Sequence, residues 1–265
     1  MPNCPLPKEL EGCRILVTND DSLSADGIKV LEKIARQFTD DVWVVAPQTQ
    51  QSGAGHSLTM HRPLRLTQVE ERRFHVDGTP TDCMVIAISK VLADKKPDLV
   101  LSGVNHGANL GEDVTYSGTI AAAMEATLLG VPAIAFSMDK SETYTWPWET
   151  AERFAPDIIR QITSIPWEAN SLFSVNFPNL PPEKVGKIRV VPHGQRKLED
   201  DLQERTDPRG RKYYWVGQLI FRDEIDHNSD IAAIADGDIS VTPLQMDLTD
   251  YDLLKRTRDV IMSSE

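Results

Sequence analysis

The 265-residue chain has few cysteines, few basic residues and no long apolar run. Its cysteines, Cys4, Cys13 and Cys83, are scattered and odd in number, which excludes a disulfide framework or a zinc pattern and favours a reducing, cytoplasmic location. The chain has 40 acidic residues and only 28 Lys and Arg, so its net charge is −12 and a nucleic-acid polymer is not expected as a partner. No segment approaches membrane-spanning length, and the amino terminus has no signal pattern, so we expect no membrane association.

What the chain does have is an alternation of short apolar segments with helical patterns. The apolar segments predict strands, at 15–17, 41–47, 97–103, 131–137, 172–178 and 187–193. The periodic segments predict helices over 28–38, from a cap at Thr81 or Asp82 to Leu92, over 118–130 with Gly130 at its end, and around 154–162. This alternation is typical of a parallel sheet with helices on both faces.

The pattern changes near residue 195. Residues 196–230 are charged and rich in turn formers, yet they contain Tyr213-Tyr214-Trp215, so we expect a hairpin or arm outside the main sheet. An isolated hairpin is marginal in water, and these side chains need a partner surface. We therefore divide the chain into a flexible extension (1–13), an α/β catalytic core (14–195), an oligomerisation arm (196–230) and a final strand and helix (231–265) that returns to the core or to a dimer interface.

Three polar loops follow predicted strands and would meet at the carboxyl edge of the sheet, where open α/β sheets bind ligands. They are Asn19-Asp20-Asp21, "QTQQSGAGHS" (48–57) and "SGVNHGANLG" (102–111). Their carboxylates, hydroxyls and amides form an all-oxygen set that suits Mg²⁺ or Mn²⁺ better than zinc. A shared cation would also remove the repulsion between Asp20 and Asp21. The alternative is that the acid pair is only a turn or a helix cap.

A fourth segment, Ser117-Gly118-Thr119, stands at the start of the alanine-rich helix. Free backbone N–H groups and the helix dipole favour an anion there. Plain N-capping by Ser117 or Thr119 is the competing interpretation, and the sequence does not decide between them. A cation loop beside an anion-holding helix start indicates cleavage of a phosphate ester.

These segments together resemble the survival protein SurE family of metal-dependent 5′-nucleotidases. The resemblance covers nearly the whole chain from about residue 14 and rests on seven motifs in family order: "VTNDDS", "VVAPQTQQSGAGHS", "DGTPTDC", "LSGVNHGANLG", "YSGTIAAAMEA", "DPRGRKYYW" and "ISVTPLQMDLT". It implies a Rossmann-like three-layer α/β sandwich with a mostly parallel sheet and a carboxyl-terminal arm. One departure is Ser22, where the family usually has glycine; if the position needs positive φ, serine costs roughly 1 kcal/mol or more.

The resemblance also implies the residues of the site. One divalent cation, Mg²⁺ or Mn²⁺, would be held by two carboxylates, a hydroxyl and an amide: Asp20, Asp21, Ser52 and Asn105. The expected catalytic residues are Asp20, Asp21 and Asn19. The residues expected to bind the substrate phosphate are Asn109, Ser117, Gly118 and Thr119.

The implied reaction is hydrolysis of nucleoside 5′-monophosphates, extending to 3′-nucleotides and short polyphosphate. The implied assembly is a homodimer or homotetramer. A non-catalytic nucleotide-binding or stress-sensing module on the same fold is the alternative.

Overall fold

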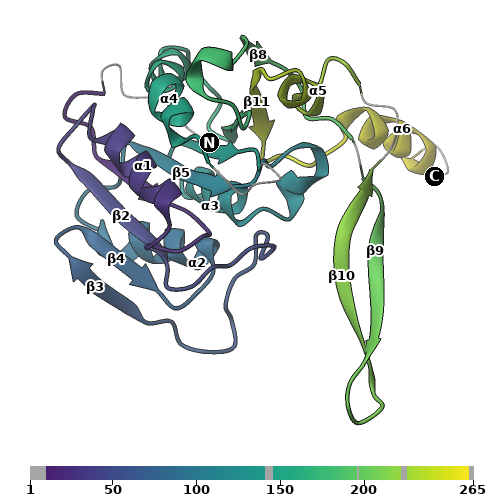
Figure 1. The fold of residues 1–265 in the computed structure, drawn as a ribbon. Coiled ribbons are helices and arrows are strands. Elements are labelled where there is room, and N and C mark those ends of the chain that lie inside the picture. The colour runs from purple at the N-terminus through teal and green to yellow at the C-terminus, as the bar shows by residue number, and fades with distance from the viewer. Residues whose placement is uncertain (1–9, 141–145, 196, 222–225, 263–265) are drawn as a thin grey trace.

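The computed structural model describes residues 10–140, 146–195, 197–221 and 226–262, and of residues 197–200 and 217–221 only the backbone (Figure 1). Within these residues, nine strands form one sheet in the order β3-β4-β2-β1-β5-β6-β7-β11-β8. The strands are β1 (Ile15–Thr18), β2 (Val42–Pro47), β3 (Leu66–Glu70), β4 (Arg73–Val76), β5 (Leu99–His106), β6 (Ala133–Met138), β7 (Ser171–Phe177), β8 (Ile188–Val190) and β11 (Ile239–Gln245). In this sheet, as far as the described residues go, only β3 with β4 and β7 with β11 pair antiparallel.

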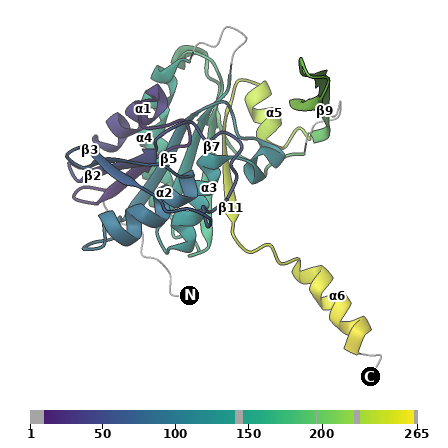
Figure 2. The same cartoon turned by 90° about the horizontal axis from the view of Figure 1, so that it is seen from below.

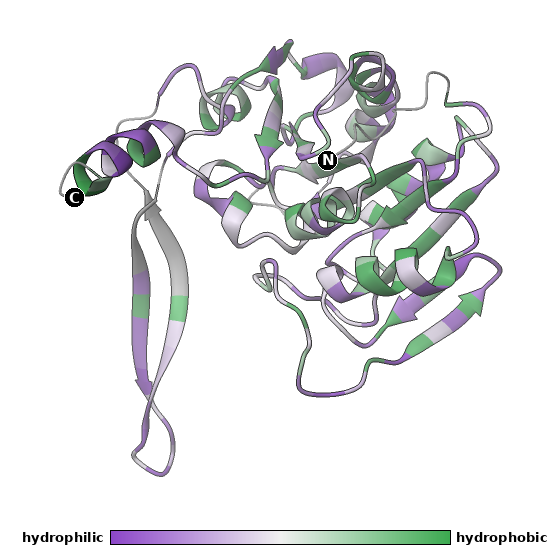
Figure 3. Ribbon diagram, turned by 180° about the vertical axis from the view of Figure 1, so that it is seen from behind, coloured by the Kyte–Doolittle hydropathy of each residue, from purple (hydrophilic) through white to green (hydrophobic). Residues whose placement is uncertain are grey.

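Helices cover both faces of this sheet because its central strands are apolar on both sides. Ile15 and Val17 pack into a cluster with α1 (Asp26–Ala35) and α4 (Trp148–Thr163). Leu16, between them, points the other way and packs with α2 (Pro80–Ile86), the π-helical turn η1 (Ala87–Val91) and α3 (Gly118–Leu128). Side chains alternate across a strand, so one continuous apolar run supplies two cores. Figure 3 shows the central strands of the sheet mostly in the hydrophobic colour. The predicted three-layer α/β fold is confirmed.

Strand β1 lies between β2 and β5, and all three run in the same direction. Its last residue, Thr18, is in register with Ser102 of β5, and Val17 is in register with Val44 of β2. The polar segments that follow these strands are therefore brought to one edge of the sheet, as predicted.

Several element boundaries differ from the prediction. Helix α2 is capped by Thr79, not by Thr81 or Asp82, because the Thr79 hydroxyl accepts from the Asp82 N–H at 3.1 Å and the Asp82 carboxylate accepts from the Thr79 N–H at 2.8 Å. Strand β5 does not stop at Gly103 but runs to His106. Strands β3 and β4, helix α5 (Asp230–Ala235) and two short 3₁₀ turns, η2 (Gly111–Thr115) and η3 (Pro182–Lys184), were not predicted.

The carboxyl-terminal part contains the predicted hairpin, formed by β9 (Lys197–Thr206) and β10 (Lys212–Phe221) in antiparallel register. We call residues 197–221 the arm. The arm projects from the body in Figure 1, and helix α6 (Tyr251–Met262) projects from it in Figure 2; every residue of α6 is exposed. Most of the predicted flexible extension, residues 1–9, lies outside the described residues, and the division into domains stays a prediction. No helix in the described ranges is long and apolar enough to cross a membrane.

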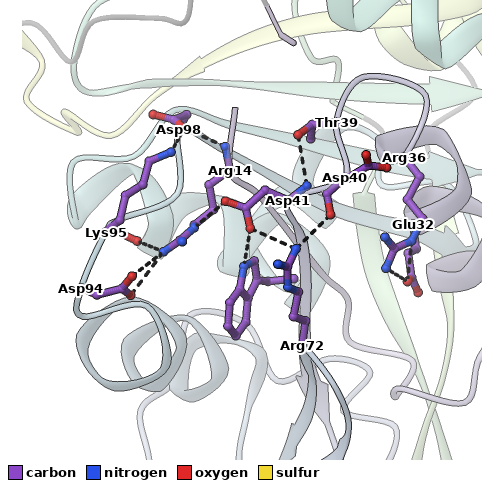
Figure 4. A network of polar contacts seen from close by, with 11 residues as sticks. Arg14, Glu32, Arg36, Thr39, Asp40, Asp41, Arg72, Asp94, Lys95 and Asp98 are labelled. Atoms are coloured by element: carbon purple, nitrogen blue, oxygen red, sulfur yellow. Dashed lines mark hydrogen bonds and ion pairs between the residues drawn. The ribbon is translucent and has the colours of Figure 1, made fainter. Parts of the chain in front are cut away.

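The amino-terminal end of β1 carries a network of ion pairs (Figure 4). The guanidinium of Arg14 donates to Asp41 at 3.0 Å and to Asp94 at 3.2 Å, and its backbone N–H donates to Asp98 at 2.7 Å. Burial opposes ionisation of Asp41, but hydrogen bonds from Arg14 and Trp43 outweigh it and lower the pKa of Asp41. The carboxylates at this end of the strand are thus paired with the positively charged side chain of Arg14. The opposite end of β1 also carries carboxylates, and their partners are different.

Candidate active site

Asp20 lies just past the carboxyl end of β1 and is almost fully buried, with 4% of its surface exposed. One of its oxygens, Oδ1, accepts a hydrogen bond of 2.5 Å from the Thr119 hydroxyl, 99 residues away in the sequence. Its backbone carbonyl accepts from the Gln51 N–H at 2.8 Å. Asp20 therefore joins the start of α3 to the loop that follows β2.

The start of α3 approaches Asp20 so closely that only glycine fits between them. A Cβ placed on Gly118 would lie 2.7 Å from Asp20 Cβ and 2.9 Å from Asp20 Oδ2. Ser117 is the N-cap of the helix, because its hydroxyl accepts from the Ile120 N–H at 3.1 Å. The capping interpretation thus holds for the Ser117 side chain, while the Thr119 hydroxyl is directed to Asp20. Phosphate binding by Ser117, Gly118 and Thr119 stays a prediction.

Asp21 is held by the end of β5. Its Oδ2 lies 3.1 Å from the His106 backbone N–H and 2.8 Å from His106 Nδ1. The His106 ring in turn stands edge-on to two stacked indoles, those of Trp146 and Trp148, with ring centroids 5.1 and 5.0 Å away. This His–Trp packing fixes the imidazole, so the imidazole can fix the Asp21 carboxylate.

The loop between β2 and β3 supplies Ser52 to the same place. The side-chain amide of Gln50 donates to Ser52 Oγ at 3.0 Å and to Asp21 Oδ1 at 3.4 Å, so both oxygens lie around one amide. Asn105 precedes His106, and its Nδ2 donates to the Gly107 carbonyl at 2.7 Å. The structure therefore places Ser52 near Asp21, and Asn105 next to the His106 that contacts Asp21, and their role as ligands stays a prediction.

Asn19 supports the turn that carries the two carboxylates. It is fully buried, and its Nδ2 donates to the Ser22 carbonyl at 2.9 Å. Ser22 has φ of +97°, so the position does take the positive φ that strains a serine, and its hydroxyl lies 3.0 Å from that of Ser24. Among the described residues, Asn19 Oδ1 has no hydrogen-bond partner. A buried orphan oxygen beside two carboxylates is an observation that fits a cation-binding site.

Asn109 is 7% exposed and is held from several sides. Its backbone N–H donates to Asn176 Oδ1 at 2.8 Å, and Asn176 Nδ2 donates back to its carbonyl at 3.2 Å. Its side-chain Nδ2 donates to Ser137 Oγ at 2.8 Å. Binding of phosphate by Asn109 stays a prediction. Ser102 is fully buried and donates to the Thr119 carbonyl at 2.7 Å, so its hydroxyl stabilises the start of α3.

The electrostatics of the acid pair suit a cation. Burial, with a smaller contribution from the charge of Asp21, raises the pKa of Asp20 to about 6 against the hydrogen bond from Thr119. In the described part of the chain, no lysine or arginine forms an ion pair with either carboxylate, unlike the Arg14 end of the strand. Nor do those residues hold a cluster of three or more His, Cys, Asp and Glu that could bind a metal ion. A cation here would thus be held by two carboxylates and neutral oxygens, the donor set of Mg²⁺ or Mn²⁺.

Sequence reasoning missed the contacts that hold these carboxylates. His106, the last residue of β5, contacts Asp21 across 85 residues of sequence. Asn176, Trp146 and Trp148 were not considered as part of the site. No periodicity or spacing marks such long-range contacts, although an imidazole in a polar loop at the sheet edge was a usable signal.

The fold and this edge define an α/β sandwich with a buried acid pair at the carboxyl ends of its central strands. A family model described as survival protein SurE matches residues 15–200. The chain belongs to the SurE family.

Its relatives and a solved structure agree with this assignment over most of the chain. The chain is 54% identical to "5′-nucleotidase SurE" of Paramagnetospirillum magneticum over 91% of its length and 93% of the relative's. It is 52% identical to the protein of that name from Brucella canis, covering 89% of this chain and 93% of the relative. The crystal structure of the SurE protein from Aquifex aeolicus superposes with a TM-score of 0.81 at 38% identity, covering 93% of this chain and 98% of that one.

Proposed function

We propose that this protein is a divalent-metal-dependent 5′-nucleotidase that hydrolyses nucleoside monophosphates to nucleoside and phosphate. The observation that carries the proposal is the Asp20–Asp21 pair, in which Asp20 is buried and the Asp21 side chain is 6% exposed, and which has no Lys or Arg partner among the described residues, in a chain about half identical to relatives named 5′-nucleotidase SurE. Activity on 3′-nucleotides and short polyphosphate belongs to the same proposal, because the proposed site would bind the phosphate group of the substrate rather than its base.

In the proposed site, Asp20, Asp21, Ser52 and Asn105 hold one Mg²⁺ or Mn²⁺. When bound, the cation polarises the phosphoryl group and lowers the pKa of water. Thr119 orients Asp20, His106 orients Asp21, and Asn19 holds the turn on which both sit. The start of α3 at Ser117, Gly118 and Thr119, with Asn109, binds the phosphate oxygens.

The proposed chemistry is direct attack of water on phosphorus, with cleavage of the bond to the ester oxygen of the ribose and departure of the nucleoside with a proton. A phosphoenzyme is not expected, because none of the described His or Lys residues forms a hydrogen bond with Ser117 or Thr119 to activate it as a nucleophile. A single in-line displacement inverts configuration at phosphorus, so retention with a chiral phosphorothioate substrate would overturn this mechanism.

The activity test is phosphate release from a panel of 5′- and 3′-nucleotides with Mg²⁺, with Mn²⁺ and with EDTA. Metal-dependent release that is lost in Asp20→Asn and Asp21→Asn supports the proposal. Tight nucleotide binding without phosphate release under every condition would instead identify the non-catalytic nucleotide-binding module.

We also propose that the protein assembles as a homodimer or homotetramer through the arm and α6. Tyr214 and Trp215 are exposed on the arm, and Tyr251, Leu253 and Ile261 are exposed on α6. A two-stranded hairpin is marginal alone, so these surfaces need a neighbour. Light scattering should find at least a dimer, and replacing residues 200–225 by a short Gly-Ser linker should give a smaller species. A monomer at micromolar concentration in the full-length chain would refute this.

A further inference from the structure

The segment from Asn105 to Gly111, which we call the Asn loop, is held at three points along its length. At its start, the Asn105 side chain donates to the Gly107 carbonyl at 2.7 Å. In its middle, Asn176 exchanges two hydrogen bonds with the Asn109 backbone. At its end, the Gly111 N–H donates to Asp230 Oδ2 at 2.9 Å, across 119 residues of sequence.

Asp230 also joins the two chain segments from which the arm departs. Its Oδ1 accepts from the Gly194 N–H at 2.7 Å, and its own N–H donates to the Pro192 carbonyl at 3.0 Å. Residues 192–194 precede the arm and Ser229-Asp230 follow it. We call these two segments, which Asp230 joins, the neck of the arm. Asp230 is 2% exposed, and its two carboxylate oxygens hold the Asn loop on one side and the neck on the other.

Close packing accompanies these hydrogen bonds. Leu110 of the Asn loop forms a small apolar cluster with Ile231 and Ile234 of α5, separate from the two main cores. A Cβ placed on Gly111 would lie 2.9 Å from the Gly194 carbonyl oxygen, so the loop and the neck are in direct contact. Because close-packed groups transmit displacement rather than absorb it, a shift of the neck moves the Asn loop.

We infer that Asp230 is a positioning residue that couples the neck of the arm to the Asn loop and so to the cation-binding end of the site. The inference rests on the proposed function, in which Asn105 is a cation ligand. It means that packing of the arm against a second copy of the chain adjusts the geometry of Asn105. Asp230 itself contacts neither cation nor substrate.

The test is binding of Mn²⁺ alone to the full-length protein, measured by calorimetry. Asp230→Asn keeps the volume but puts an NH₂ group where a carboxylate oxygen accepts an N–H, so one of the two attachments is lost. The expected result is a Kd for Mn²⁺ raised about tenfold, the size usual for groups that orient ligands. In nucleotide hydrolysis at saturating Mn²⁺, kcat should fall while KM changes little.

A matched control is Asp238→Asn in the same part of the chain. Asp238 is 7% exposed and accepts from the Lys187 N–H at 2.9 Å, so it too is a buried carboxylate that holds a backbone turn, but it does not contact the Asn loop. The Kd of Asp238→Asn for Mn²⁺ should stay within about twofold of the wild type, even if its thermal stability falls as much as that of Asp230→Asn.

Unchanged Mn²⁺ affinity in Asp230→Asn, or an equal loss in Asp238→Asn, would overturn the inference. Should Asp230→Asn fail to unfold cooperatively, Ile231→Ala decides by the same criterion, since it loosens the contact with Leu110 and leaves the carboxylate in place. A wild-type protein that binds Mn²⁺ but releases no phosphate would refute the proposed function and leave the coupling intact.

Discussion

Replacing Asp20 by asparagine should stabilise the metal-free protein while it abolishes cation binding. The pKa of Asp20 is about 6 in the fold against 3.8 for an ordinary aspartate. Each pKa unit corresponds to about 1.4 kcal/mol, so the ionised carboxylate lowers the free energy of unfolding by about 3 kcal/mol above pH 6. An asparagine oxygen can still accept the hydrogen bond from Thr119, so the variant removes the charge and keeps the contact.

The sign of the pH dependence follows from the raised pKa. Because the folded state holds the proton more tightly, wild-type stability from this group is complete below about pH 4 and is lost as pH rises through about 6. The advantage of Asp20→Asn should therefore be largest at pH 8 and fall to about half at pH 5. For a chain of this size, 3 kcal/mol corresponds to a Tm higher by about 6 °C or more.

The assay is thermal unfolding in EDTA at pH 5 and pH 8, repeated with millimolar Mn²⁺. Mn²⁺ should raise the Tm of the wild type by mass action and leave that of Asp20→Asn unchanged. Asp82→Asn is the control, because Asp82 is equally buried but accepts from Thr59 N–H at 3.0 Å and Thr79 N–H at 2.8 Å. It should lose about 1–3 kcal/mol at both pH values. An Asp20→Asn protein no more stable than wild type at pH 8 would refute the reasoning.

Three further substitutions test the contacts around the acid pair. Thr119→Val keeps the shape but removes the hydrogen bond to Asp20, and should cost about 1 kcal/mol or somewhat more in kcat/KM for AMP; unchanged kinetics would show that the hydroxyl serves neither Asp20 nor phosphate. His106→Ala should weaken Mn²⁺ binding about tenfold, and His106→Asn should recover part of it by restoring a donor to Asp21; equal affinities in calorimetry would contradict this. At Ser22, the glycine variant should have a free energy of unfolding about 1 kcal/mol higher than that of the alanine variant, because alanine keeps the strain at φ +97°. The opposite order of stabilities in denaturant titration would exclude strain there.

The sequence predicted the sheet and the place of the site because both depend on local patterns. The run Ile15-Leu16-Val17 is apolar at every position, as a strand with two covered faces requires, and the acid pair follows it directly. Parallel strands end at one edge, so the loops after β1, β2 and β5 had to meet. The seven motifs then indicated which oxygens those loops would bring together.

What escaped prediction depends on contacts between distant parts of the chain. The Thr119 hydroxyl binds Asp20 across 99 residues, and Asp230 binds Gly111 across 119. The cap of α2 was misplaced because Thr79, Thr81 and Asp82 are all good caps, and only the geometry of the turn selects Thr79. Strands β3 and β4 were missed because β3 is exposed throughout and has no apolar run.

The contrast between the two ends of β1 has a consequence for the choice of buffer. At one end Arg14 meets Asp94, whose side chain is 71% exposed, so simple salt weakens that attraction as the Debye length shortens from about 10 Å at 0.1 M to about 3 Å at 1 M, close to the 3.2 Å between the charged groups. At the other end the acid pair is buried, and dissolved ions screen buried charges far less. Potassium chloride should therefore loosen the first end without relieving the repulsion at the second. Monovalent salt, at any practical concentration, should not replace a divalent ion in this protein.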